Sequence, residues 1–372
     1  MKIIINAWSA RLGGGQTYLK NLLANLPTRP DLDIVVYAPA SLHLPVDKRV
    51  RRGTTRWPTK NPLLRTVWEK IALPRIVARE KFAVLFCPGG LITSRVPVGC
   101  KTVTMFRNMI PFDPIARARA PLGLQTVRNF LLKRLMLRSM CSADLTIFIS
   151  DHARRVIESL VRVRNAVTIS HGIGAAFRTH GQALARPAWL PQGEYLLYVS
   201  KFDVYKHQFE VASAFAGLPA NLRSRYKLLF LGERDEVLAR RVTDLARTEK
   251  LEERIVLVGS VDYVELPAAY HHATVNLFAS TCENCPNILL EALGAGRPVL
   301  CSDVMPMPEF GGDAVGYFSP TDPISIRDEL MRVLLDESRS SKLASAAARR
   351  SADFDWANTS KATWQRIMAL TA

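Results

Sequence analysis

Short apolar runs, separated by longer stretches of helical character, recur along the whole chain. The first half contains six runs, which begin at Lys2, Asp33, Ala83, Lys101, Asp144 and Ala166. The second half contains five more, which begin at Tyr195, Lys227, Arg254, Thr274 and Arg297. Runs that are apolar on both faces and alternate with helices are typical of buried parallel strands. The pattern predicts an α/β protein with two doubly wound, Rossmann-like domains in series.

A segment without periodicity, residues 171–194, separates the two sets of runs. The length of 372 residues also suits two domains of about 150–200 residues each. We expect an N-terminal domain over residues 1–178, a C-terminal domain over 179–350, and a C-terminal helix over 351–372 that packs back on the first domain. Ligands of such sheets bind outside the carboxyl ends of the strands. Two domains that face each other across a cleft would bring these ends together.

The net charge of +17 is divided unevenly between the two halves. Residues 1–178 carry +20 and residues 179–372 carry −3. This asymmetry predicts an anionic partner for the first domain: a membrane surface, a phosphorylated acceptor or nucleic acid. No apolar run is long enough to span a membrane, and the first residues do not resemble a signal peptide. We therefore expect a cytoplasmic protein.

The segment from Cys282 to Asp303 contains two glutamates, Glu283 and Glu291, around a helix that begins near Asn287. The first-turn amides of such a helix attract phosphate. Glycosidase carboxylates face each other across one bond, whereas eight helical residues span about 12 Å. The spacing better suits two carboxylates that bind separate rings of an elongated ligand, with phosphate between them. Two unrelated glutamates remain the alternative.

Metal binding has little support in the sequence. The only close cysteine pair, Cys282 and Cys285, lacks the second pair or the nearby histidines that a zinc site requires. The six cysteines of the chain show no disulfide pattern. We expect Cys282 and Cys285 to be reduced thiols that line a loop, with a thioredoxin-like redox pair as the alternative, and we expect no metal.

Weaker candidates follow other strands. Lys201 and Lys206 could converge on a diphosphate and neutralise a leaving group, although solvated lysines are the common alternative. Gly14 and Gly15 belong to a three-glycine turn through which the backbone can approach a ligand. This turn does not match the dinucleotide fingerprint and is equally consistent with a simple strand-to-helix connection.

Three further polar residues of the first half are candidates for acceptor or cleft contacts. Arg107 and Asn108 follow the fourth apolar run, where ligand contacts are expected. His171 ends the first domain and is as consistent with a structural role in a hinge as with a ligand contact.

Taken in order, these motifs resemble the retaining GT-B glycosyltransferases of family 4. Glu283 and Glu291 resemble the E-x7-E motif of that family, residues 198–206 its diphosphate-binding segment, and residues 13–15 its N-terminal loop. The resemblance covers nearly the whole chain and is concentrated in residues 195–320.

The resemblance implies a role for each matching residue. Glu283 would contact the donor sugar and Glu291 the ribose, while Lys201 and Lys206 would hold the diphosphate; Glu283 and the two lysines are the catalytic candidates. The remaining donor-binding candidates are Gly14, Gly15, Ser260, Val261, Asn284, Cys285, Pro286 and Asn287. The chain departs from the family pattern where Lys201 replaces arginine and loses its bidentate fork, where Arg107 and Asn108 replace a histidine, and where His207 replaces a glycine.

The resemblance predicts a metal-independent, retaining hexosyltransferase without a cofactor. It would transfer sugar from a nucleoside-diphosphate-sugar to a lipid-linked or glycan acceptor in cell-surface polysaccharide or lipopolysaccharide synthesis. One alternative is a nucleic-acid-binding protein, although the basic residues are spread without a recognisable binding module. A non-catalytic nucleotide-sugar-binding protein is the other.

The basic first half contains a segment, Pro121–Met140, that combines helical character with positive charge. Leu124, Val127, Leu131 and Leu135 form a stripe that predicts a buried face. Its basic residues are Arg128, Lys133, Arg134 and Arg138; nearby basic residues are Lys48, Arg49, Arg51, Arg52, Arg56, Arg117 and Arg119. Because clustered cations attract anionic lipids, we expect the first domain to bind the inner membrane surface peripherally and not to bind nucleic acid.

Overall fold

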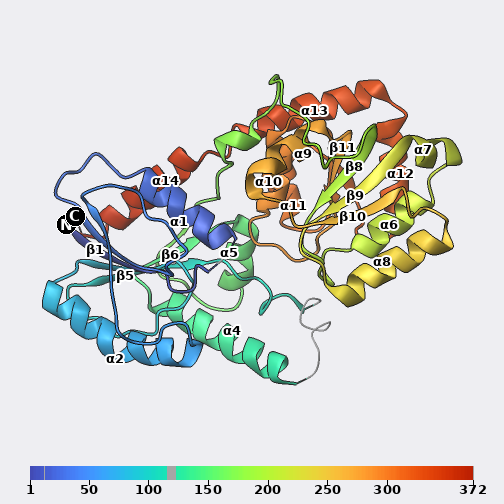
Figure 1. Cartoon of the computed structure of the whole chain (residues 1–372). Helices are drawn as coiled ribbons and strands as arrows, with labels where there is room; N and C mark the ends of the chain where they lie inside the picture. Colours follow the sequence, from blue (N-terminus) through green and yellow to red (C-terminus); the bar gives the residue numbers. More distant parts are fainter. Residues whose placement is uncertain (12, 115–122, 372) are drawn as a thin grey trace. The chain divides into compact units, whose positions relative to one another are not determined.

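The computed structural model describes residues 1–11, 13–114 and 123–371. The chain divides into two compact units, Met1–Gly172 with Trp356–Ala372, and Ile173–Asp355. Each unit is a parallel sheet with helices on both faces (Figure 1). The predicted fold class, two doubly wound α/β domains, is therefore confirmed.

The sheet of the first unit has, within the described residues, seven parallel strands in the order β3-β2-β1-β4-β5-β6-β7. Ile3, Ile4 and Ile5 of β1 are fully buried, because helices cover both faces. The charged edge strand β3 was not predicted, since it lacks an apolar run. The strands are β1 (Lys2–Asn6), β2 (Asp33–Tyr37), β3 (Val50–Arg52), β4 (Val84–Cys87), β5 (Lys101–Phe106), β6 (Leu145–Phe148) and β7 (Ala166–Thr168).

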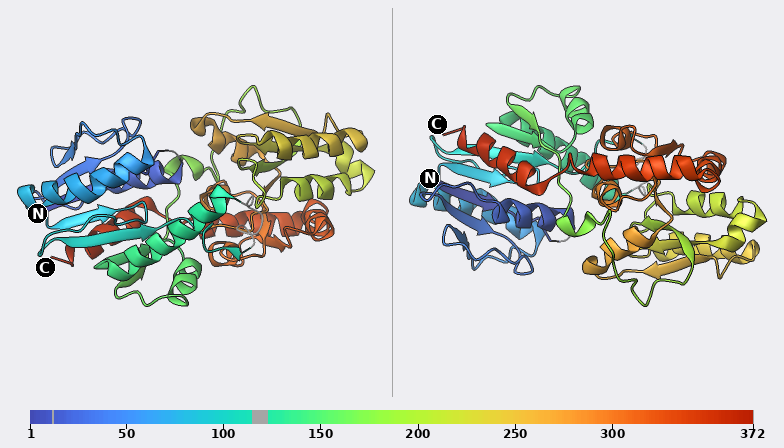
Figure 2. Two further views of the ribbon diagram at one scale, coloured as in Figure 1. Left: turned by 90° about the horizontal axis from the view of Figure 1, so that it is seen from below. Right: turned by 90° about the horizontal axis from the view of Figure 1, so that it is seen from above.

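The helices of the first unit lie on two faces of this sheet. The last helix, α14, lies beside α1, and the indole Nε1 of Trp364 donates to the carbonyl of Leu22 at 3.0 Å. On the other face, α2 and α4 lie side by side (Figure 2). The Asn61 side chain caps α2 by accepting from the amides of Leu63 and Leu64. The helices are α1 (Gly14–Ala24), α2 (Pro62–Glu80), α4 (Leu124–Ser142), α5 (Asp151–Glu158) and α14 (Trp356–Met368).

The described strands of the second unit form a parallel sheet in the order β10-β9-β8-β11-β12-β13. They are β8 (Glu194–Val199), β9 (Tyr226–Leu231), β10 (Ile255–Gly259), β11 (Val275–Phe278), β12 (Val299–Ser302) and β13 (Gly316–Phe318). The 3-10 turns are η1 (Ala175–Phe177) and η2 (Tyr263–Glu265). The helices are α6 (Gln208–Ala216), α7 (Ala220–Arg225), α8 (Glu236–Thr248), α9 (Leu266–His272), α10 (Asn287–Gly294), α11 (Met307–Gly311), α12 (Pro323–Leu334) and α13 (Glu337–Ser351).

The order of strands reverses once in each sheet. In the first unit β1 lies between β2 and β4, and in the second unit β8 lies between β9 and β11. The connection after β8 leads to β9 on one side of the sheet, and the connection after β11 leads to β12 on the other, so the carboxyl ends of β8 and β11 form a switch point. Such switch points are where open α/β sheets bind ligands.

The predicted buried stripe of α4 is wrong. Val127, Leu131 and Leu135 are 57%, 54% and 49% exposed, whereas Met136 and Met140 are buried. Because α4 carries apolar residues around most of its circumference, the spacing of its leucines does not identify the side that packs on the sheet. The Leu124 side chain, Pro121, Arg117 and Arg119 lie outside the description. No helix within the described residues is both long and apolar enough to cross a lipid bilayer.

Candidate functional site

A buried ion pair lies at the switch point of the second unit. Lys206, in the segment that follows β8, contacts Oε1 of Glu283, in the segment that follows β11. The side chains of Lys206 and Glu283 are only 6% and 16% exposed. The Ser280 hydroxyl also donates to Glu283 Oε1, at 2.7 Å. The pair places a desolvated ammonium group and a carboxylate where a ligand of this fold is expected.

The surroundings hold Lys206 in place. Its Nζ lies 4.8 Å from the centre of the Phe278 ring, a distance at which the ring attracts a cation. The Tyr198 hydroxyl donates to the Lys206 carbonyl and accepts from the amide of Ala279 at 3.3 Å. These contacts fix both segments that carry the ion pair, so the charges are preorganised before any ligand binds.

The second glutamate of the motif has different partners. The Tyr263 hydroxyl donates to Glu291 Oε1 at 2.9 Å and the Tyr270 hydroxyl to Oε2 at 3.5 Å. Burial raises the pKa of Glu291 to about 7, although both tyrosine hydrogen bonds act in the opposite direction. Glu291 is therefore a carboxyl group that changes charge near neutral pH and can both donate and accept hydrogen bonds.

The two lysines predicted to act together have separate partners. Lys201 is 55% exposed and forms an ion pair with Asp203 at 2.9 Å. It lines a hollow of about 470 Å³ that Glu233 and Arg234 also line. Its convergence with Lys206 on a diphosphate stays a prediction.

His207 occupies a position where its backbone favours glycine. Its φ is 54°, in the left-handed region that costs a residue with a Cβ about 1–2 kcal/mol. The buried ring compensates, because Nε2 lies 3.0 Å from the Thr281 hydroxyl and Nδ1 lies 3.6 Å from Glu210. The Thr281 contact ties the segments after β8 and β11 together beside the ion pair.

The loop that enters α10 is packed tightly. Asn284 is buried and Cys285 partly buried, and Pro286 rather than Asn287 is the N-cap residue. The amide of Asn287 donates to the Cys285 carbonyl at 3.0 Å. The amide of the partly buried Ile288 donates to no backbone carbonyl among the described residues. It is the first-turn amide that could most readily reach a phosphate group.

The small residues near the end of α10 allow another backbone segment of the same unit to pack closely against the helix. A Cβ on Gly294 would lie 2.7 Å from the carbonyl oxygen of Phe177 in η1. This glycine therefore allows a close backbone contact within the second unit. Ser260 and Val261 lie in the short connection between β10 and η2. Tyr263, the first residue of η2, donates to Glu291.

Candidates from the first unit gather around α1. Gly14 and Gly15 form its first turn, and a Cβ on Gly15 would lie 3.1 Å from Arg107 Nη1. The Arg107 guanidinium lies 6.0 Å from the Tyr18 ring centre, and that ring lies 5.6 Å from the His171 ring. His171 is 2% exposed, which indicates a packing role.

Asn108 lies next to this cluster and supports a turn. Its Oδ1 accepts from the Ile110 amide at 3.2 Å. This contact explains why a short polar side chain is suited to the turn after β5.

A hollow of about 790 Å³ follows β1, β2 and β3 at their carboxyl ends. Trp8 and Trp57 line it together with Thr54, Thr55 and cationic Arg11. The Trp8 ring packs edge-on against Trp68 at 6.2 Å, and its buried Nε1 has no hydrogen-bond partner among the described residues. Aromatic walls with nearby hydroxyls suit a ring that is apolar on one face and polar at its edge.

Several contacts of this site were not predicted from the sequence. Tyr263 and Tyr270 come from η2 and α9, and Ser280 from the loop that follows β11. The sequence gives little indication of these contacts, because isolated tyrosines and serines are common in loops. Within the described residues, no group of three or more His, Cys, Asp or Glu side chains could hold a metal ion, and the six cysteines are free.

Two family models match the chain, one in each half. "Glycosyltransferase Family 4" matches residues 12–177 and "Glycosyl transferases group 1" matches residues 185–350. The serotype-specific mannosyltransferase WbdA of Escherichia coli is 26% identical over 268 residues, which are 70% of this chain and 32% of WbdA. O-antigen chain mannosyltransferase B of Escherichia coli is 29% identical over 237 residues, 60% of each chain. This chain thus spans about a third of WbdA.

Solved structures share the fold over the whole chain. Sucrose-phosphate synthase from Thermosynechococcus elongatus has a TM-score of 0.76 at 16% identity, covering 100% of this chain and 99% of that one. WaaG, a glycosyltransferase involved in lipopolysaccharide biosynthesis, has a TM-score of 0.73 at 14% identity, covering 98% of both chains. At these identities the likeness shows the fold, and the family models show the class. The chain belongs to the family 4 type of glycosyltransferases, with the two-domain GT-B fold.

Proposed function

We propose that this glycosyltransferase is a retaining hexosyltransferase that moves a sugar from a nucleoside-diphosphate-sugar to a glycan or lipid-linked acceptor. Its pathway would be the synthesis of a cell-surface polysaccharide or lipopolysaccharide, because two relatives are named as mannosyltransferases and one of them as an O-antigen enzyme. The observation that carries the proposal is the buried Lys206–Glu283 pair at the switch point of the second unit.

The donor would bind along the carboxyl ends of β8 and β11. Lys206 would hold the diphosphate, Glu283 the hydroxyls of the transferred sugar, and Glu291 the ribose. Tyr263 and Tyr270 already orient the Glu291 carboxyl. The amide of Ile288 would supply a further donor to the phosphate, because first-turn amides carry partial positive charge.

The chemical step would not require an enzymatic nucleophile. The bond between the anomeric carbon and the diphosphate oxygen breaks, and both of its electrons leave with the diphosphate. The acceptor hydroxyl attacks from the same face, and its proton passes to the departing diphosphate. Lys206 stabilises the charge that develops on the leaving group, so the proposed reaction does not need a metal.

The acceptor would bind in the hollow after β1, β2 and β3. Trp8 and Trp57 offer ring faces, and Thr54 and Thr55 offer hydroxyls. A sugar ring has an apolar face, which can stack on the tryptophan rings, and a polar edge, which can form hydrogen bonds with the threonine hydroxyls. The cationic Arg11 favours an acceptor that carries a negative charge.

The first unit would bind to the surface of an anionic membrane. Its sequence carries most of the positive charge, and α4 combines exposed apolar side chains with Arg128, Lys133 and Arg134. Each basic residue near an anionic leaflet contributes about 1 kcal/mol. A few of them would hold the enzyme reversibly on the inner surface, where a lipid-linked acceptor is available.

A two-stage assay tests the proposal. Thermal unfolding is first measured with GDP-, UDP- and dTDP-sugars, because a ligand that binds only the folded state raises the melting temperature. The stabilising donor is then incubated with candidate glycan acceptors, and release of the nucleoside diphosphate is followed. Binding without acceptor-dependent release would indicate a nucleotide-sugar sensor. Salt-sensitive DNA binding without any donor effect would support the nucleic-acid alternative.

A further inference from the structure

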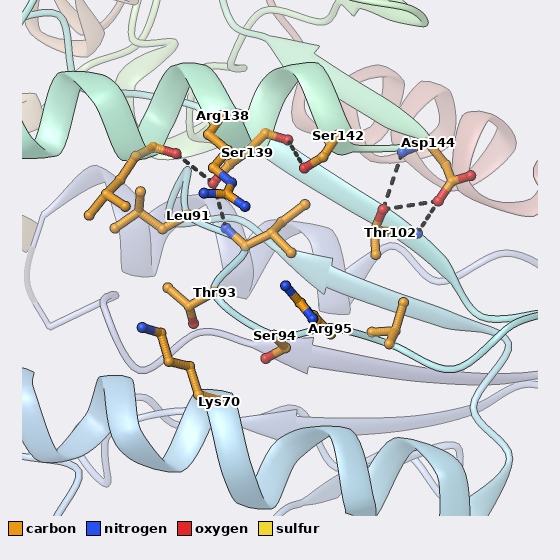
Figure 3. A pocket seen from close by; sticks show the side chains of 13 residues that line it. Lys70, Leu91, Thr93, Ser94, Arg95, Thr102, Arg138, Ser139, Ser142 and Asp144 are labelled. Atoms are coloured by element: carbon orange, nitrogen blue, oxygen red, sulfur yellow. Dashed lines mark hydrogen bonds between the residues drawn. The ribbon is translucent and has the colours of Figure 1, made fainter.

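A second hollow of the first unit lies away from the carboxyl ends of the strands. It has a volume of about 730 Å³ and lies between α2, the loop after β4 and the end of α4 (Figure 3). Thr102 at the start of β5 and Asp144 just before β6 form one end of it. It therefore opens near the amino ends of these strands, where substrates of this fold do not bind.

Three cationic side chains from three elements line this hollow. Lys70 comes from α2, Arg95 from the loop and Arg138 from α4 (Figure 3). None of the three forms an ion pair with a carboxylate in the part of the chain that the structure describes. The acid of the lining, Asp144, accepts from the Thr102 amide at 2.8 Å and is paired with Lys101 at 3.5 Å. The hollow thus carries uncompensated positive charge.

The wall between the two helices is fixed by hydrogen bonds. The Thr93 hydroxyl donates to Glu69 Oε2 on α2 at 2.6 Å, and the Ser94 hydroxyl donates to the Glu69 carbonyl. The Ile92 amide donates to the Ser139 hydroxyl on α4 at 3.0 Å. The hollow is therefore formed before a ligand arrives, which lowers the entropy cost of binding.

Each helix carries an exposed apolar stripe that leads to one of these cations. On α2, Leu63 and Val67 are 78% and 39% exposed and precede Lys70 on the same side of the helix. On α4, Val127, Leu131 and Leu135 are about half exposed and precede Arg138 in the same way. A water-soluble anion would leave both stripes in water. An amphipathic phosphate would use the cations and the stripes together.

We propose that the hollow between α2 and α4 binds the phosphate headgroup of an anionic phospholipid while the two stripes enter the surrounding lipid. The bound lipid is an anchor and not a substrate, because the hollow lies away from the strand ends that would take the acceptor. The inference rests on the proposed membrane placement of this enzyme but not on the identity of its donor. It names the residues through which that placement is achieved.

Co-sedimentation of the full chain with vesicles tests the site. The pocket variant Lys70→Ala/Arg95→Ala/Arg138→Ala is compared with the distal variant Lys20→Ala/Arg162→Ala/Arg164→Ala, which removes the same charge from exposed positions elsewhere in the first unit. With phosphatidylcholine vesicles that contain phosphatidylglycerol, the pocket variant should bind on the order of 100-fold more weakly than the unchanged chain. The distal variant should lose only a few-fold, because its charges act at a distance.

A second pair of measurements separates the stripes from the charge and the lipid from free phosphate. Val67→Ser/Leu131→Ser should still bind at low salt but lose most binding at physiological salt, where charge alone is screened. Inorganic phosphate should not raise the melting temperature of the unchanged chain. A phosphate-dependent rise that the pocket variant abolishes, without vesicle binding, would make this a soluble-anion site and overturn the lipid assignment.

The outcomes distinguish this inference from the proposed transferase function. If the pocket and distal variants lose vesicle affinity equally, or if the pocket variant loses none, the hollow is not the lipid-binding site. Transfer to a water-soluble acceptor should be unchanged in the pocket variant, which also shows that the variant is folded. If the unchanged chain binds vesicles through the pocket but transfers no sugar, the transferase proposal fails and the lipid site stands.

Discussion

The buried Lys206–Glu283 pair can be dissected by removing either charge. Glu283→Gln leaves the ammonium group of Lys206, which is 6% exposed, without its carboxylate. Lys206→Met leaves the Glu283 carboxylate with the Ser280 hydroxyl. Breaking a buried pair in this way costs about 3–5 kcal/mol, because one charge stays desolvated and uncompensated. For a unit of this size, this corresponds to a fall in melting temperature of roughly 6–20 °C.

The double variant Lys206→Met/Glu283→Gln separates folding from catalysis. It removes both charges and should recover much of the lost stability. It should not recover transfer, because it lacks the groups that hold the diphosphate and orient the sugar. Calorimetric unfolding measures the first effect, and donor turnover per folded enzyme measures the second. Glu249→Gln, at an exposed position of the same unit, is the matched control and should change neither.

Two results would refute this reasoning. If each single variant has the same melting temperature as the unchanged chain, the pair is not a buried ion pair in solution. If the double variant transfers sugar at the original rate, the pair is only structural, and the proposed roles of Lys206 and Glu283 are wrong.

Three other perturbations have defined outcomes. Glu291 has a pKa of about 7 in the folded chain, against an ordinary value of 4.5. Between these two pH values the folded state keeps a proton that the unfolded state releases. The free energy of unfolding should therefore fall by up to roughly 3 kcal/mol as pH rises through this window. An ionised carboxylate accepts from ribose hydroxyls more strongly than a neutral one, so donor affinity should rise over the same pH window. Glu291→Gln should remove both this rise and the slope in melting temperature. His207→Gly should be more stable in denaturant than His207→Ala by about 1 kcal/mol, because φ at this position favours glycine; equal stabilities would show that the backbone is not strained. Transfer should survive EDTA, and an enzyme that EDTA inactivates and Mg²⁺ or Mn²⁺ restores would contradict the proposed metal independence.

The alternation of apolar runs predicted the fold well, because buried parallel strands need apolar side chains on both faces. It missed one edge strand in each sheet. β3 (Val50–Arg52) is mostly charged, and β13 (Gly316–Phe318) has only three residues, too few to form a recognisable apolar run. The same kind of reasoning failed for α4, where apolar residues occur on several sides and the buried side depends on tertiary packing. Pattern therefore identified the elements more reliably than the faces they bury.

The site was only partly predictable for a related reason. Glu283, Glu291 and Lys206 follow strands, so topology alone could place them at the same edge of a sheet. Which groups they contact depends on distances between segments that are far apart in the sequence: Lys206 reaches Glu283, whereas Lys201 pairs with Asp203. The tyrosines on Glu291, which hold its carboxyl near the ligand edge, have no sequence signal of their own.

The central proposal is transfer of sugar with retention of configuration, and one product analysis tests it most directly. The donor that most stabilises the chain is incubated with an acceptor glycan, and the new linkage is assigned by NMR from the coupling at the anomeric carbon. The account predicts an acceptor-dependent product whose anomeric configuration matches that of the donor, and loss of this product in Glu283→Gln. A product of inverted configuration, or donor binding that never yields a product with any acceptor, would contradict it.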